Sequence, residues 1–383
     1  MKILKIRYDQ IGLFKNGFEI DLTASDRVTK DMQVQELYRS IYTQNVIGII
    51  GINATGKSTA LKLINMAMDI ILDNKGLENI DIPSGIIKDG TTLTVYFYKE
   101  SNFYKISSKI GYKDNQAEGY QEKNKYYFKE EVIYSKRKST VQSKDQLYDF
   151  NNANEEINRG EIEIEGKKTF LKDQDSIVSA ITAEETVKHF DMIMDTNFNI
   201  LWTKGIAKAE FVSLFDQSID QINVEKDKAT ITFKNSSQDI QAERLIDIHH
   251  TLSSGTIKGI NLFEKASLAL KTGGYLIIDE IENHMHKKLV QTIIRFFMDP
   301  DVNKKGATLI FSTHYAEIID TIERKDSIYV FRKTPDLHIE VIKYSEKIKR
   351  NDIKKSEVFL SNLIDGTAPS YEDVQIVRKY LCQ

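Results

Sequence analysis

The sequence has little cysteine and proline and no long apolar run. Among its 383 residues there are four prolines and one cysteine, Cys382, which excludes an internal disulfide. No apolar run approaches the roughly 18 residues that a membrane-spanning helix needs, so no membrane partner is expected. The segment from Met1 to Phe14 mixes charged with apolar side chains, which indicates a strand rather than a signal peptide. We therefore expect a cytoplasmic protein.

An excess of charge of one sign is also absent. The chain has 53 Lys and Arg against 56 Asp and Glu, so nothing in the overall balance requires a nucleic-acid partner. A hydrophobic content of 41% is ordinary for a soluble globular protein, and the length allows one large domain or two to three modest ones. Neither sustained heptads nor an internal repeat is present, which argues against a long coiled coil.

The stretch from Gly51 to Ser58, Gly-Ile-Asn-Ala-Thr-Gly-Lys-Ser, matches the phosphate-binding pattern G-x-x-x-x-G-K-[ST]. Residues 45–50 before it predict a buried strand, and apolar residues recur at helical spacing from Thr59 to Leu72. Such a loop points backbone N–H groups and a helix N-terminus at one spot, which suits a polyphosphate. Lys57 is expected to reach the β- and γ-phosphates, and Ser58 to ligate Mg²⁺. The predicted ATP-binding residues are Gly51, Asn53, Ala54, Thr55, Gly56, Lys57, Ser58 and Thr59.

Two further segments predict buried strands that end at polar residues. Residues 275–278 lead into Asp279 and Glu280, where Asp279 is expected to hold Mg²⁺ through water and Glu280 to deprotonate the attacking water. Acids after a strand also occur in solvated turns, but the phosphate-binding loop favours catalysis. Residues 307–313 lead into His314. Ligands of doubly wound sheets lie at the carboxyl ends of the strands, so a γ-phosphate contact by His314 is favoured over a structural role.

A turn of small residues, Leu252-Ser253-Ser254-Gly255-Thr256, begins a predicted helix that extends to about Leu270. Hydroxyl groups and a glycine at a helix N-terminus form an anion site, although an isolated turn of this kind would only cap the helix. Because the turn lies about twenty-five residues before the two acids, an anion site at Ser253, Ser254, Gly255 and Thr256 is favoured over a simple cap.

In this order the motifs resemble those of ABC-type ATPases. Residues 51–58 match Walker A, residues 252–256 the signature, residues 275–280 Walker B, and His314 the switch histidine. The resemblance implies an α/β ABC-ATPase fold, with a P-loop core sheet, an antiparallel β lobe, and a helical lobe inserted between Walker A and the signature. It also implies that the signature contacts ATP held by a partner's Lys57. Two copies would then form a head-to-tail homodimer, or a higher even oligomer, around ATP, and hydrolysis would loosen it.

The residues after Walker B narrow the resemblance. Glu282 to His286, Glu-Asn-His-Met-His, is similar to a pattern of the group that contains RecF, SMC-like and OLD-type (overcoming lysogenization defect) ATPases and the Septu- and AbiL-like phage-defence ATPases. The usual proline after the histidine is Lys287 here, and Thr256 stands where Gln or an acid is commoner. His286 is either a subunit contact or a helix-start residue. Gln142 and Gln146 are weak candidates for the Q-loop glutamine.

Composition and patterning divide the chain into four parts. Residues 1–138 are expected to form ATPase lobe I, and residues 251–344 the half of the core with the signature, Walker B and switch histidine. Residues 139–250 are expected to hold a polar excursion over 139–165 and a mostly helical insert over 176–224. A short strand at 228–233 and a helix at 240–249 are expected within them. Residues 345–383 predict a charged helical tail.

Three functions are compatible with these motifs. The gap before the signature lacks heptads for a long arm, and too few residues follow His314 for the TOPRIM nuclease that OLD proteins append. A compact ATPase that controls a separate effector, a nuclease or toxin from the same operon, in anti-phage defence is therefore favoured. The alternative is a RecF- or SMC-like repair ATPase that clamps DNA; its only support is two basic clusters, at 136–138 and 347–355, which also fit a solvated surface. A membrane transporter subunit is disfavoured because no clear Q-loop is present.

Overall fold

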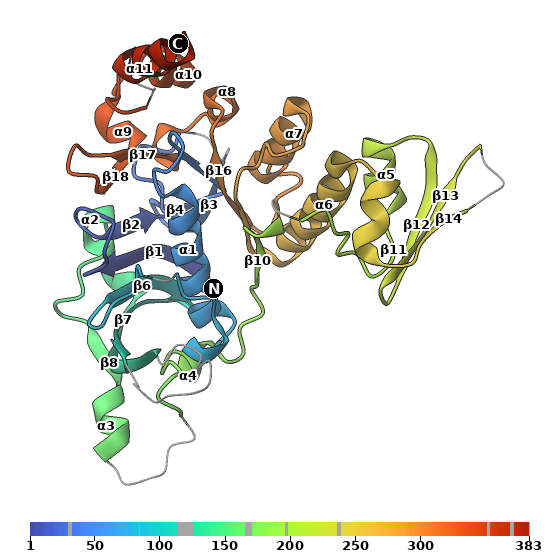
Figure 1. Cartoon of the computed structure of the whole chain (residues 1–383). Helices are drawn as coiled ribbons and strands as arrows, with labels where there is room; N and C mark the ends of the chain where they lie inside the picture. Colours follow the sequence, from blue (N-terminus) through green and yellow to red (C-terminus); the bar gives the residue numbers. More distant parts are fainter. Residues whose placement is uncertain are drawn as a thin grey trace, which may run out of the picture.

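The computed structural model describes residues 1–29, 33–83, 85–113, 126–164, 171–195, 198–235, 239–350, 353–367 and 371–382. The sequence predicts a strand over residues 125–134, and its first residue, Lys125, lies outside the described residues. Glu165 at the end of the polar excursion and Asp352 in the second basic cluster also lie outside them. The predicted α/β class is confirmed, because a central, mostly parallel sheet is covered by helices and by a second, antiparallel sheet (Figure 1).

The central sheet has the strand order β10-β15-β16-β5-β17-β18. The first five strands run parallel, and β18 returns antiparallel to β17. Because β16 lies between β15 and β5, the carboxyl ends of three neighbouring strands meet at one edge. The strands are β5 (Val46–Ile50), β10 (His189–Met192), β15 (Tyr275–Ile278), β16 (Thr308–Thr313), β17 (Ile328–Lys333) and β18 (Ile339–Lys343).

Both faces of this sheet are covered, which is why its strands are continuous apolar runs. Along β5, Ile47 and Ile49 point to the side of helix α1 (Lys57–Leu72), whereas Val46 and Ile50 point to the opposite side. The opposite side is covered by α6 (Ser254–Thr272), α7 (Lys287–Met298) and α8 (Ala316–Ile319). The helix after the phosphate-binding loop is thus fixed on one side of the sheet and the helix after the signature on the other.

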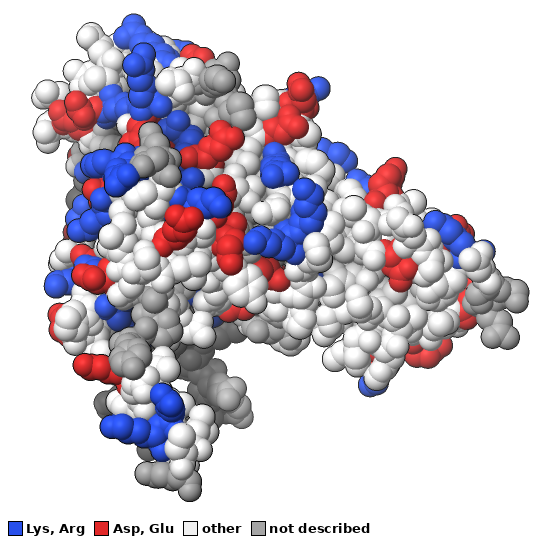
Figure 2. Space-filling view, turned by 90° about the horizontal axis from the view of Figure 1, so that it is seen from above, with Lys and Arg blue, Asp and Glu red and all other residues white. Residues whose placement is uncertain are grey.

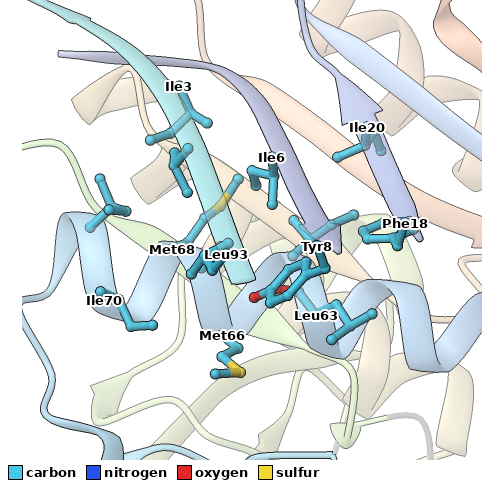
Figure 3. Close-up of a cluster of buried hydrophobic side chains, with 14 of the residues drawn as sticks. Ile3, Ile6, Tyr8, Phe18, Ile20, Leu63, Met66, Met68, Ile70 and Leu93 are labelled. Atoms are coloured by element: carbon cyan, nitrogen blue, oxygen red, sulfur yellow. The ribbon is translucent and has the colours of Figure 1, made fainter. Parts of the chain in front are cut away.

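An antiparallel sheet of order β2-β1-β6-β7-β8-β9 packs on the outer side of α1. Figure 3 shows Ile6 and Leu93 of its strands on the side of the helix toward which Met68 points, whereas Met66 points away from them. The Tyr8 hydroxyl donates a hydrogen bond of 2.8 Å to the Leu63 carbonyl. The strands are β1 (Lys2–Asp9), β2 (Phe18–Asp21), β6 (Thr92–Lys99), β7 (Asn102–Tyr112), β8 (Tyr126–Arg137) and β9 (Asn154–Asn158).

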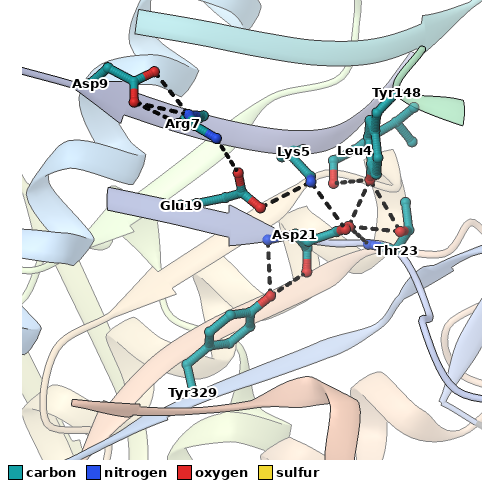
Figure 4. A network of polar contacts seen from close by, with 9 residues as sticks. All are labelled: Leu4, Lys5, Arg7, Asp9, Glu19, Asp21, Thr23, Tyr148 and Tyr329. Carbon is teal, nitrogen blue, oxygen red and sulfur yellow. Dashed lines mark hydrogen bonds and ion pairs between the residues drawn. The ribbon is translucent and has the colours of Figure 1, made fainter. Parts of the chain in front are cut away.

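A polar network joins this second sheet to the central one (Figure 4). The Tyr329 hydroxyl on β17 accepts from the backbone N–H of Asp21 and donates to its carbonyl, both at 2.9 Å. The Asp21 carboxylate accepts from the Tyr148 hydroxyl at 2.8 Å. These contacts bond β2 and the segment around Tyr148 to the core.

The polar stretch after β8 is not the solvated excursion that its composition predicts. It forms η2 (Lys138–Thr140), α2 (Lys144–Leu147), edge strand β9 and α3 (Arg159–Ile164). Val141 and Leu147 are buried against Phe103, beside the hairpin of β3 (Val34–Tyr38) and β4 (Ile41–Gln44). A few apolar side chains among many polar ones therefore suffice to fold this segment onto the sheet.

The insert before the signature is also not mostly helical. It contains α4 (Ser179–Thr182), β10, β11 (Gly205–Ile206), α5 (Ala209–Phe215), β12 (Ile219–Glu225), β13 (Lys228–Phe233), β14 (Ile240–Ala242) and η4 (Leu245–His250). The strand predicted at 228–233 is confirmed, whereas the helix predicted at 240–249 is replaced by β14 and, from Leu245, by the 3-10 helix η4. The insert forms strands because its apolar residues pack on one face of a four-stranded sheet. In β12 these residues are Ile219, Ile222 and Val224, and they pack with α6. Figure 1 shows this sheet as an arm beyond α6.

The remaining described elements are η1 (Leu77–Asn79), η5 (Lys325–Ser327), α9 (Tyr344–Lys347), α10 (Lys355–Leu360) and α11 (Tyr371–Leu381), the last three forming the expected helical tail. None of the described helices combines the length with the apolar character that crossing a bilayer requires.

Candidate nucleotide-binding site

The loop between β5 and α1 needs both of its glycines. Gly56 has φ +83°, and a Cβ there would lie 2.1 Å from Cδ1 of Ile339. A Cβ on Gly51 would lie 2.3 Å from the carbonyl oxygen of Phe331. Neighbouring strands therefore press on this loop from the side of β17 and β18. Ala54 also adopts positive φ, at 60°. The result is a tight backbone cradle at the N-terminus of α1, of the size and polarity that phosphates occupy.

Lys57 lies at the bottom of this cradle and is buried. Its Nζ donates to the carbonyls of Gly51 and Ile52, both at 2.9 Å, and lies 3.2 Å from Nδ1 of His314. Burial lowers the pKa of the Lys57 ammonium from its ordinary value to about 8. Three nearby carboxylates, those of Asp279, Glu280 and Glu282, favour the charged form and limit that pKa shift.

The turn after β15 carries the two predicted acids. Asp279 is buried, and its Oδ1 accepts a hydrogen bond from the Ser312 hydroxyl on β16. Glu280 has φ 47°, a left-handed conformation that costs a non-glycine residue about 1–2 kcal/mol. Its backbone N–H donates to Ser312 Oγ at 2.8 Å. Strain of this kind persists only where surrounding contacts enforce it, and such positions cluster at functional sites.

His314 lies between Lys57 and Glu280. Its Nε2 is 3.0 Å from Oε1 of Glu280, while its Nδ1 faces the Lys57 ammonium. Because an ammonium donates and a carboxylate accepts, the neutral tautomer with the proton on Nε2 fits both contacts. The backbone N–H of His314 donates to Oε1 of Glu282 at 2.7 Å. Glu282 thus anchors the backbone at His314, a role that the sequence pattern did not assign to it.

A cavity of about 440 Å³ opens above these groups. Most predicted Walker A residues line it, together with Glu280 and His314. Sequence reasoning missed an apolar part of its wall, formed by Leu13, Leu337 and Ile339. Leu13 and Leu337 are partly exposed and both have positive φ. The available signal was an apolar residue in a polar turn, Asp336-Leu337-His338. The lining residues are Leu13, Asn53, Ala54, Thr55, Gly56, Lys57, Ser58, Thr59, Glu280, His314, Lys333, Leu337 and Ile339.

The signature residues do not line this cavity. Ser253 caps α6, because its Oγ accepts from the Thr256 N–H at 3.0 Å. A Cβ on Gly255 would lie 2.6 Å from the carbonyl oxygen of His284, so the glycine permits close packing on the loop after Walker B. His286 caps α7, with Nδ1 accepting from the Lys288 N–H, which fits the helix-start interpretation.

The Q-loop candidate Gln142 precedes α2 and Gln146 lies within it, and both are outside the cavity lining. Gln146 instead accepts a hydrogen bond of 2.8 Å from the Gln142 N–H.

The chemistry of the donors fits a hard cation. Ser58 lines the cavity, and Asp279 offers carboxylate oxygen at the neighbouring strand end. Oε2 of Glu282 is buried without a hydrogen-bond partner among the described residues. An all-oxygen set beside a phosphate cradle is what Mg²⁺ with a nucleotide prefers. The one described group with metal-ligand spacing, Asp69, Asp73 and His189, includes the last turn of α1 and is occupied by ion pairs with lysines.

A family model matches most of the chain. The family described as "AAA domain, putative AbiEii toxin, Type IV TA system" matches residues 46–320, from the start of β5 to the residue after α8. The matched range contains the phosphate-binding loop, the signature, the two acids and His314. A comparison with the curated proteins gave no match.

Proposed function

Because the chain belongs to this family of P-loop ATPase domains, of the AAA and ABC-like type, we propose that it binds ATP with Mg²⁺ and hydrolyses it. The observation that carries the proposal is the meeting of Lys57, Glu280 and His314 at the wall of one cavity. Lys57 and His314 are 257 residues apart in the chain and 3.2 Å apart in space.

The triphosphate would enter the cradle between Gly51 and Ser58. Lys57 Nζ would exchange its two backbone carbonyls for oxygens of the β- and γ-phosphates. A triphosphate is a stronger partner for an ammonium than neutral carbonyls are, and its charge favours the protonated lysine. The apolar wall at Leu13 and Leu337 would hold the base above the phosphates.

Glu280 would act as the general base. A water held by its carboxylate attacks the γ-phosphorus, its proton passes to Glu280, and the bond from that phosphorus to the β,γ-bridging oxygen breaks. ADP and inorganic phosphate are the products. His314, already in contact with Glu280, would orient the carboxylate and approach the γ-phosphate. Mg²⁺, held by Ser58 and by Asp279 through water, would neutralise charge on the phosphates.

We further propose a head-to-tail dimer around ATP. Its support is that the turn at Ser253–Gly255 lies outside the cavity of its own chain while remaining partly exposed at the N-terminus of α6. A helix N-terminus that carries serine hydroxyls is suited to phosphate, so a second copy is the proposed source of that phosphate. ATP would hold the two copies together, and hydrolysis would release them.

The family description names a toxin of a toxin–antitoxin system. We therefore extend the proposal to a cytoplasmic ATPase that controls a separate effector, a nuclease or toxin, in anti-phage defence. Co-purification from the native operon tests this part. Recovery of the chain alone, with neighbouring genes unrelated to effectors, would count against it.

Phosphate release from ATP tests the enzymatic part. The parental chain is expected to turn over ATP with Mg²⁺ and to stop with EDTA. Lys57→Ala should abolish ATP binding, whereas Lys62→Ala, on the same helix but outside the cavity lining, should behave like the parent. A Lys57→Ala protein that binds ATP with parental affinity would contradict the assignment.

The DNA-clamping alternative gains no specific support. In Figure 2, basic and acidic side chains intermingle on the face viewed from above. In the first basic cluster, Lys136 Nζ donates to the carbonyls of Gln146 and Asp149, so this ammonium is engaged within the chain. Binding of DNA only with ATP, weakening steeply with salt, would revive this alternative.

A further inference from the structure

Ser312, on the central strand β16, is the contact that holds the Walker B turn in place. It is fully buried and lies outside the cavity lining. Its hydroxyl joins two successive residues of the turn, accepting from the Glu280 N–H at 2.8 Å and donating to Oδ1 of Asp279. Its backbone carbonyl accepts from the Ile281 N–H at 3.1 Å. One residue therefore bonds three consecutive positions.

These bonds replace the sheet ladder where it stops. The parallel pairing of β15 with β16 ends at Ile278 opposite Phe311. Beyond that pair, Glu280 turns to φ 47°, which moves its N–H out of the ladder. A buried N–H without a partner is costly, so the Ser312 hydroxyl both satisfies this donor and selects the left-handed turn.

The direction of the hydrogen bonds follows from the chemistry. An N–H only donates, so Ser312 Oγ must accept from Glu280 and send its own proton to Asp279. One oxygen of the Asp279 carboxylate is thereby occupied, and the carboxylate is fixed in rotation. The hydroxyl of the next residue, Thr313, does not replace Ser312 at the turn, because Thr313 Oγ1 accepts from the Tyr315 N–H.

We propose that Ser312 is a positioning residue for ATP hydrolysis, one that sets the backbone of Glu280 and the orientation of Asp279 at once. This inference rests on the proposed function. Because Ser312 does not line the cavity, its loss should leave ATP affinity nearly unchanged. It should lower kcat, since misplacing a reacting group by about 1 Å costs on the order of 100-fold. It should also raise the Mg²⁺ concentration needed for half-maximal rate, since Asp279 loses its fixed orientation.

The experiment compares hydroxyl variants on one strand. Ser312→Ala is expected to lower kcat by about 10- to 100-fold, with KM for ATP within about threefold of the parent. Ser312→Cys keeps the volume but has a weak S–H donor, so it should behave like Ser312→Ala. Ser312→Thr keeps the hydroxyl and should restore most of the rate. The matched control is Thr308→Val, which deletes a buried hydroxyl on the same strand that donates to the Gln44 carbonyl at 2.9 Å.

Each variant is also measured for thermal unfolding and for rate against Mg²⁺ concentration. If Ser312→Ala and Thr308→Val lose kcat and thermal stability equally, and neither changes the Mg²⁺ requirement, Ser312 has only a packing role and the inference is overturned. Parental kcat in Ser312→Ala alongside an inactive Glu280→Gln would overturn it while leaving the proposed function intact. A parental chain that binds ATP without hydrolysing it would overturn both.

Discussion

Replacing Glu280 by glutamine separates chemistry from binding. The substitution keeps the side-chain length. In the parent, Nε2 of His314 lies 3.0 Å from the Glu280 carboxylate, and the amide oxygen of glutamine can still accept from this N–H. The strained φ of 47° is unchanged, since both residues carry a Cβ. What is lost is the negative charge that takes the proton from water.

The structure implies a small effect of Glu280→Gln on stability and a large effect on the rate of hydrolysis. The Glu280 side chain is 42% exposed, so weakening its bond to His314 should cost less than about 1 kcal/mol of unfolding free energy. Losing the general base should lower kcat by about 10²–10⁴-fold, equivalent to about 2.7–5.4 kcal/mol of activation free energy. ATP should remain bound, and the proposed dimer should accumulate.

Three measurements together test this prediction. Phosphate release at saturating ATP and Mg²⁺ gives kcat, a fluorescent ATP analogue gives affinity, and light scattering after size exclusion gives the mass with ATP present. Glu317→Gln is the matched control, because Glu317 is an exposed glutamate just beyond His314 and outside the cavity lining. Hydrolysis by Glu280→Gln at the parental rate would refute the general-base assignment.

Three other predictions follow from the geometry of the cavity. Since the Lys57 pKa is about 8 in the free protein and a triphosphate favours the charged lysine, ATP binding at pH 8.5 should take up about 0.8 proton. Calorimetry in buffers of different ionisation enthalpy measures this uptake, and the same value in Lys57→Arg would contradict it. Gly56→Ala should lower the unfolding free energy by about 2–5 kcal/mol, because strain at φ +83° adds to a clash with Ile339. The control Gly85→Ala, at φ +73° with nothing within 4 Å, should lower it by only about 1–2 kcal/mol. Equal losses of unfolding free energy in denaturant titrations would exclude a contribution from the clash with Ile339. Leu337→Ser should weaken ATP binding about 3- to 10-fold, because Leu337 forms part of the cavity wall. Stability should not change, since the side chain is 73% exposed, and the affinity for inorganic triphosphate should also stay the same. An equal loss of affinity for ATP and for triphosphate would show that Leu337 acts on the phosphates instead.

Much of the core could be predicted from the sequence because its signals are local. The strands around residues 46–50, 275–278 and 308–313 are short apolar runs bounded by polar residues, and each is confirmed. The helix beginning at residue 254 and its end at Gly273 follow from a serine cap and a glycine. These features need only neighbours in sequence.

The insert was mispredicted because its elements are short and depend on partners. Three apolar positions of β12 fit a helix as well as a strand when seen alone. They form a strand because β13 pairs with it and α6 covers the face. The polar stretch after β8 was misjudged for a related reason, since two buried side chains, Val141 and Leu147, decide its placement.

By itself, the sequence determined a phosphate-binding loop, two strands that end in polar residues, and hence a nucleotide site at one edge of a sheet. Only the tertiary structure decided that β16 lies between β5 and β15, which places His314 between Lys57 and Glu280. It also decided that Ser312 holds the acidic turn and that Leu337 joins the cavity wall. The physical reason is that strand order and register arise from packing between distant segments, and local patterns carry no record of them.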